Sequence, residues 1–156
     1  MPNTKPVGVA FSDPELVAGT TITGATISGG TISSATSVTA TSVSASDITT
    51  TGGLYIKTAT VAAAGSTQAN AAAVSDGFTL VTAADGTKGV VLPAAIAGRT
   101  VILKNSAGST LKVWPASGDA INAIAADSNF TMATVTSCMY VAYDSTTWYS
   151  IPLVAS

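Results

Sequence analysis

The sequence predicts an all-β protein with an extended N-terminal arm, an intertwined trimeric β-stalk and a C-terminal antiparallel β-sandwich or barrel. Three observations carry this prediction. β-Branched residues recur at short, regular intervals between residues 20 and 50, which favours extended backbone. Short apolar runs separated by turn residues fill the chain from residue 54 onward. Charged residues make up only 9% of the 156 residues, against roughly 25% in ordinary soluble domains.

Residues 1–19 form the expected arm. Pro2, Pro6 and Pro14 space this segment out, and proline both fixes φ and lacks an amide hydrogen, so extended or turn structure is favoured over helix. Its apolar residues are too few to form a core, and we expect them to dock on another surface. The alternative is a frayed terminus. The candidate docking residues are Val7, Val9, Phe11 and Leu16.

Residues 20–53 hold a five-residue repeat followed by a glycine turn. Threonine begins successive units at positions 21, 26, 31, 36 and 41, and a small residue closes each of these units. One large β-branched aliphatic residue occupies each unit, with a slip of one residue between the third and the fourth. These aliphatic residues are Ile22, Ile27, Ile32, Val38, Val43 and Ile48.

A period of five needs a coiled β-structure, because a flat strand would send successive apolar residues to opposite faces. A single-chain solenoid needs several full coils to bury a core, and these units supply little more than one. Three chains winding together would bring three aliphatic side chains inward at each level. We therefore predict a trimeric stalk in which these six residues form the trimer contact. A flexible Ser/Thr-rich linker is the alternative.

Residues 54–156 form the expected sandwich domain. An Ala-rich stretch at 63–77 predicts a short helical turn or a loop, and Asp85-Gly86, Gly118-Asp119 and Asp144-Ser145 predict turns. Many short strands between turns are typical of an antiparallel sandwich or barrel. The predicted strands are 54–62, 78–83, 89–92, 100–105, 109–114, 121–124, 130–133, 138–143 and 147–152.

The segment Asn105–Gly108 separates two runs with alternating apolar residues, which predicts a β-hairpin between 100–104 and 109–114. Few charges are available to protect edge strands or to solvate the outer faces of such a domain. Surfaces of this kind are commonest where neighbouring subunits cover them, so we expect an obligate oligomer or a member of a larger assembly. The large residues expected in the core or at an interface are Phe78, Trp114, Phe130, Tyr140 and Trp148.

Composition excludes most catalytic chemistry. The chain has no histidine, and its one cysteine, Cys138, lies in an apolar strand and is expected to be a buried small residue. Six scattered basic residues form no patch for nucleic acid. Asp76, Asp85, Asp119, Asp127 and Asp144 lie near turns, where aspartates usually accept backbone hydrogen bonds; a calcium site is the alternative. We therefore expect no enzyme, no cofactor and no metal.

The N-terminal residues show no basic segment followed by an apolar one, so we expect no secretory signal. No apolar run approaches the ~18 residues of a membrane-spanning helix, so no membrane partner is expected. Arg99 is expected to pair with a carboxylate across a subunit boundary.

The run GVVLPAAIAGRTVILKNSAGSTLKVWPASGDAIN at 89–122, with Trp148-Tyr149 near the C-terminus, resembles a module of tailed-bacteriophage virion proteins. That module joins a strand ending in Leu-Pro, an Ala-Gly pair, an Asn-containing turn, a Val-aromatic-Pro and a Gly-Asp-x-Ile-Asn. The TITGATISGGTIS segment is similar to the thread-like repeats that precede trimeric phage knobs. The resemblance covers roughly residues 20–152.

The resemblance implies a homotrimeric, non-enzymatic virion protein, made in the host cytoplasm and placed on the outer surface of the head. The short chain favours a capsid decoration or head-fibre protein, whose arm would bind the major capsid protein and so stabilise the head. The alternative is a receptor-binding tail-fibre tip, in which Trp148 and Tyr149 would face a host glycan or protein. A bacterial adhesin or pilus subunit is a third alternative.

Overall fold

The computed structural model describes residues 47–153. The chain divides into two units between Ile48 and Thr49, and nearly all described residues belong to the second unit. The predicted arm residues Val7, Val9, Phe11 and Leu16 lie outside the described residues, as do the stalk residues Ile22, Ile27, Ile32, Val38 and Val43. The described unit is essentially all-β, as predicted.

Ten strands and one short 3-10 helix make up the described part of the chain. Nine of the strands lie close to the predicted positions. The short strand Ala72–Ala73 was not predicted; it falls, like the helix, in the Ala-rich stretch where a helical turn or loop was predicted. The elements are β1 (Thr58–Ala62), η1 (Gln68–Asn70), β2 (Ala72–Ala73), β3 (Gly77–Thr82), β4 (Gly89–Val91), β5 (Thr100–Asn105), β6 (Leu111–Trp114), β7 (Ala120–Ile121), β8 (Phe130–Met132), β9 (Ser137–Ala142) and β10 (Thr147–Leu153).

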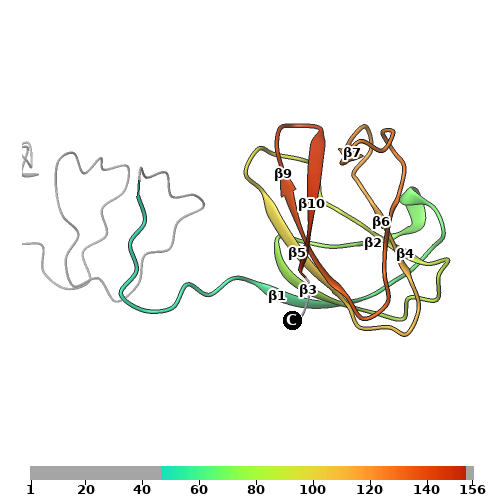
Figure 1. The fold of residues 1–156 in the computed structure, drawn as a ribbon, viewed down its shortest axis with the longest axis horizontal. Helices are drawn as coiled ribbons and strands as arrows, with labels where there is room; N and C mark the ends of the chain where they lie inside the picture. Colours follow the sequence, from blue (N-terminus) through green and yellow to red (C-terminus); the bar gives the residue numbers. More distant parts are fainter. Residues whose placement is uncertain (1–46, 154–156) are drawn as a thin grey trace, which may run out of the picture. The chain divides into compact units, whose positions relative to one another are not determined.

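The strands form two sheets that face each other across the core (Figure 1). Sheet A has the order β1-β3-β5-β9-β10-β7, and sheet B has the order β2-β4-β6-β8. From β1 to β6 the chain alternates between the two sheets, so that neighbouring strands in each sheet are parallel. This alternation is a solenoid-like arrangement, in which each coil adds one strand to each sheet.

The C-terminal part of the chain closes this solenoid with antiparallel strands. β9 pairs with β5, β8 pairs with β6, and β9 and β10 form a hairpin. The hairpin turn lies at the predicted Asp144-Ser145, where the Tyr143 N–H donates to the Thr147 carbonyl at 2.8 Å. The predicted antiparallel architecture is therefore correct for the pairs β5–β9, β6–β8 and β9–β10. It is wrong for the pairs among β1–β6 and for β7, which pairs parallel with β10.

The predicted hairpin between 100–104 and 109–114 is also wrong, because β5 belongs to sheet A and β6 to sheet B. The connecting loop crosses between the sheets and is held by Asn105, which is fully buried. Its side-chain amide donates to the carbonyls of Ser109 (2.9 Å) and Ala133 (3.0 Å), and its Oδ1 accepts the Ala107 N–H (3.1 Å). The alternating apolar residues of both strands are buried, but they enter one core from opposite sides.

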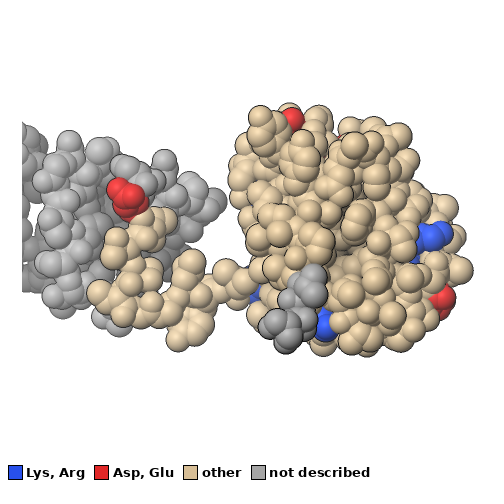
Figure 2. Space-filling model, viewed as in Figure 1, with Lys and Arg blue, Asp and Glu red and all other residues tan. Residues whose placement is uncertain are grey.

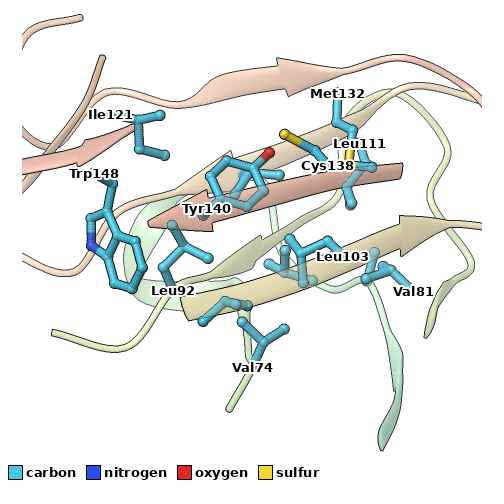
Figure 3. Packing of buried hydrophobic residues seen from close by; sticks show 14 of the residues in the cluster. Val74, Val81, Leu92, Leu103, Leu111, Ile121, Met132, Cys138, Tyr140 and Trp148 are labelled. Carbon is cyan, nitrogen blue, oxygen red and sulfur yellow. The ribbon is translucent and has the colours of Figure 1, made fainter. Parts of the chain in front are cut away.

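The core lies between the sheets and takes every second residue along β3, β5 and β9. In β5 and β9 the burial alternates strictly, with Val101, Leu103, Tyr140 and Ala142 at 0–1% exposure. Figure 3 shows Tyr140 and Trp148 pointing into this space with Leu92 and Leu103. Burying each large aliphatic side chain contributes about 1.5–3 kcal/mol, which makes this the main stabilising term of the domain.

Of the five large residues expected in the core or at an interface, Tyr140 and Trp148 are fully buried. Phe130 is half-buried and packs against the core, with its ring edge-on to Tyr140 at a centroid distance of 6.1 Å. Trp114 and Phe78 are also half-buried. Within residues 47–153, no helix is both long enough and apolar enough to cross a bilayer.

Candidate functional site

The main candidate for a functional surface is the outer side of sheet A, which is apolar across four strands. Residues that alternate with the core positions of β3, β5, β9 and β10 must point away from the core. They take no part in the core cluster. We call this surface the outer face; its apolar residues are Phe78, Leu80, Ile102, Met139, Val141, Tyr149, Ile151 and Leu153.

The strand register brings these side chains together in a line across the sheet. Phe78 lies opposite Ile102 on the next strand, and Ile102 lies opposite Met139. Met139 in turn lies opposite Ile151 of β10. Directly opposed residues have Cβ atoms about 4.5–5.5 Å apart, so their side chains touch. The line is therefore a continuous apolar ridge that runs over four neighbouring strands.

Charge is almost absent from this surface. Lys104 is the one charged residue in the six strands of sheet A, and its ammonium group donates to the Val135 carbonyl at 2.6 Å. That bond directs the charge toward the loop after β8. In Figure 2 the domain is coloured mostly as uncharged residues, with a few blue and red side chains. The outer face thus lacks the charges that normally keep an exposed sheet solvated.

A pair of tyrosines extends the outer face at the β9–β10 hairpin. The rings of Tyr143 and Tyr149 meet edge-on, with centroids 5.9 Å apart and an interplanar angle of 77°. Both side chains are open to solvent, at 71% and 49% exposure. Trp148 points the other way and is fully buried, which corrects the expectation that Trp148 and Tyr149 together face a ligand. Strand alternation is the reason, since neighbouring residues lie on opposite faces.

A groove of about 450 Å³ lies at one end of the two sheets, between β8 and the end of β10. Its walls are largely apolar and include Phe130, Met132 and Leu153. Cys138 also lines the groove, but only 4% of the residue is exposed and burial raises the pKa of its thiol. A protonated, buried thiol is a poor nucleophile, so the expectation that Cys138 is a small core residue is confirmed.

A second hollow, of about 350 Å³, lies beside the outer face. Ile56, Gly77 and Ile102 line it, together with the charged residues Lys57 and Asp76. Residues before β1 continue the apolar character of this region, because Leu54, Tyr55 and Ile56 are 50–93% exposed. Ile48, the one predicted stalk residue that the structure describes, is also exposed, at 69%.

Two of the turn aspartates accept hydrogen bonds from the backbone of their own turns, as predicted. Asp85 accepts hydrogen bonds from the Thr87 hydroxyl and from the backbone N–H groups of Thr87 and Lys88, and these bonds lower its pKa. Asp144 accepts from the backbone and hydroxyl of Thr146 in the same way, with the same effect on its pKa.

The other three aspartates, Asp76, Asp119 and Asp127, contact residues farther away in the sequence. Asp127 accepts from the Gly118 N–H and from Gln68, which lower its pKa, and the buried Asp119 accepts from the Ala95 N–H. Within residues 47–153, no three acidic or cysteine side chains come together as a metal site.

Arg99 forms its ion pair within the chain. Its Nε lies 3.0 Å from an Asp76 carboxylate oxygen, and Nη1 donates to the Ala94 carbonyl at 2.7 Å. The expectation that Arg99 pairs across a subunit boundary is corrected, because the fold places Asp76 at the start of β3, beside the loop that carries Arg99.

The sequence reasoning missed the outer face, although a signal for it is present. The runs Val101-Ile-Leu, Cys138-Met-Tyr-Val and Trp148-Tyr-Ser-Ile-Pro-Leu carry large residues at both odd and even positions. A sheet with one solvated face alternates apolar and polar residues, whereas a sheet covered on both faces is apolar throughout. Such runs therefore predict a second covered face as well as a core.

Comparison of the chain with protein-family models, curated proteins and solved structures finds no match.

Proposed function

We propose that the protein is a non-enzymatic, homotrimeric virion protein of a tailed bacteriophage, which binds the major capsid protein and stabilises the head from its outer surface. In this proposal residues 1–19 form the capsid-binding arm, residues 20–53 form the trimeric stalk, and residues 54–156 form the projecting β-domain. The resemblance of 20–152 to phage virion modules supports it.

The observation that carries the proposal is the apolar, nearly uncharged outer face. The largest apolar patch on a typical monomer covers about 300–600 Å² and often marks an interaction site. The residues that the structure describes include no histidine and no cluster of acidic side chains, and their one cysteine is buried. These features favour a protein that works by adding contact area to an assembly.

The mechanism follows from linkage. A protein that binds the assembled capsid, and not its separated subunits, stabilises the assembly by mass action. Three arms on one trimer would bind cooperatively, because the first contact raises the effective concentration of the other two. The head would then resist the outward pressure of a packaged genome.

The test is co-sedimentation of the purified full chain with empty capsids. The proposal expects saturable binding and a higher temperature of capsid disruption, both lost when residues 1–19 are deleted. A chain lacking only residues 154–156 serves as the control for truncation. Full-length protein that fails to sediment with capsids at micromolar concentration would refute the decoration role.

The exposed Tyr143–Tyr149 pair favours one second candidate, a receptor-binding tip that recognises a host surface glycan or protein. Exposed aromatic rings provide stacking surfaces for sugars and anchors for protein partners. Adsorption of the labelled protein to host cells tests this candidate. Tyr149→Ala should then reduce adsorption at least tenfold, while Tyr55→Ala, at a position that is 93% exposed and outside the pair, should leave it unchanged.

A further inference from the structure

We infer that the outer face of sheet A is a self-association surface, which packs against the outer faces of the other copies of this chain. The inference deepens the proposed homotrimer and rests on it for the number of copies. It adds that the β-domains themselves contact each other, in addition to any contact through residues 20–53.

The lack of charge on the outer face indicates what kind of partner it can bind. A charged partner would need opposite charges on this face, but Lys104 is the one charged residue in the strands of sheet A, and its ammonium group is bonded to the Val135 carbonyl. The nearest other charges, Lys57 and Asp76, lie outside these strands, at the hollow beside the face. The row formed by Phe78, Ile102, Met139 and Ile151 offers only apolar side chains. The complement of such a surface is another uncharged apolar surface, and a second copy supplies one at equal concentration.

The size of the face fits association within a larger assembly. Four strands at a spacing of ~4.8 Å and about six residues at ~3.3 Å each cover on the order of 400 Å² per copy. A stable interface between two separate proteins usually buries about 800 Å² per partner. The face alone would therefore associate weakly. Copies already joined elsewhere are held at roughly millimolar effective concentration, where a weak contact is occupied.

The shape of the outer face also favours a second copy of this chain as the partner. The hollow of about 350 Å³ bounded by Ile56 and Ile102 interrupts the edge of the face. Large exposed side chains of the same chain, such as Tyr149 and Ile151, protrude elsewhere on that face. In a cyclic trimer each subunit presents two different regions to its two neighbours, so a hollow and a protruding region on one face are the required combination.

The test compares two single-cysteine variants of the full chain, both in a Cys138→Ala background. Ile151→Cys lies on the outer face and Ile96→Cys lies in the loop before β5; the native side chains are 43% and 56% exposed. Maleimide should modify both cysteines at similar rates in a free chain. In the assembled protein we expect Ile151→Cys to react at least tenfold more slowly, and Tyr149→Cys to behave in the same way.

Light scattering on the same samples separates the outcomes. A trimer with a protected Ile151→Cys supports both the inference and the homotrimer, and a dimer with that protection supports the face alone. A trimer in which all cysteines react equally overturns the inference and leaves the homotrimer standing. A monomer overturns both, whether Ile151→Cys is reactive or is covered by the chain's own residues.

Discussion

Replacing Asn105 with alanine should destabilise the domain more than any exposed substitution, because Asn105 holds the loop that crosses from sheet A to sheet B. The residue has no exposed surface. Its side chain makes three hydrogen bonds, two to the carbonyls of Ser109 and Ala133 and one from the Ala107 N–H. Alanine removes all three and leaves those backbone groups without their partner.

The expected loss follows from the number of bonds. A hydrogen bond contributes about 1 kcal/mol net, so three bonds give a loss of about 3 kcal/mol in the free energy of unfolding. For a domain of this size, 1 kcal/mol corresponds to roughly 4–8 °C in the melting temperature. The Asn105→Ala variant should therefore melt on the order of 15 °C below the native protein.

Chemical denaturation followed by tryptophan fluorescence measures this loss, since Trp148 is buried in the core. Asn70→Ala is the matched control, because Asn70 is exposed and should change the stability by less than about 0.5 kcal/mol. Asn105→Asp keeps the acceptor for Ala107 and places a carboxylate against two carbonyls, so it should be at least as unstable at neutral pH. An Asn105→Ala variant as stable as Asn70→Ala would refute the role of this side chain.

Three further predictions concern the described domain. Gly77→Ala should cost more than about 2 kcal/mol in a melting experiment, because φ is +94° and a Cβ would overlap the Lys57 carbonyl, whereas Gly108→Ala, with open space around it, should be neutral. Hydrogen bonds lower the pKa of Asp85, Asp127 and Asp144 below 3.8 on folding, so the stability that they add is present above that pH and is lost below it. The melting temperature should therefore stay flat between pH 5.5 and 8, where no histidine titrates, and fall below pH 4; a step near pH 6.5 would contradict this. Cys138 should react with maleimide at least a hundredfold faster in denaturant than in the native protein, and equal rates would show that it is accessible.

Local sequence patterns were sufficient to locate most of the strands. Leucine and valine recur at every second position in 100–105 and 111–114, and Gly118 and Asp144 end or turn the chain where such residues usually do. The tight β9–β10 turn was predictable for the same reason, since Asp144 accepts hydrogen bonds from the backbone of the turn itself. These features depend on interactions within a few residues, and those are visible in the sequence.

Strand partners and face assignments were not visible, because they depend on residues far apart in the chain. The segment 105–110 could turn back as a hairpin or cross to the other sheet, and the long-range hydrogen bonds that hold the crossing, such as that of Asn105 with the Ala133 carbonyl and that of Ser106 with the Val81 carbonyl, are not visible in the sequence. Trp148 and Tyr149 are equivalent as aromatic residues, and only the register against β9 decides which is buried. The sequence alone determined that the chain forms β-strands around an apolar core with very little charge. The tertiary structure decided that these strands form a parallel, two-sheet coil with a second apolar face. The reason is that strand pairing and register determine which side chains face the core between the sheets and which face outward.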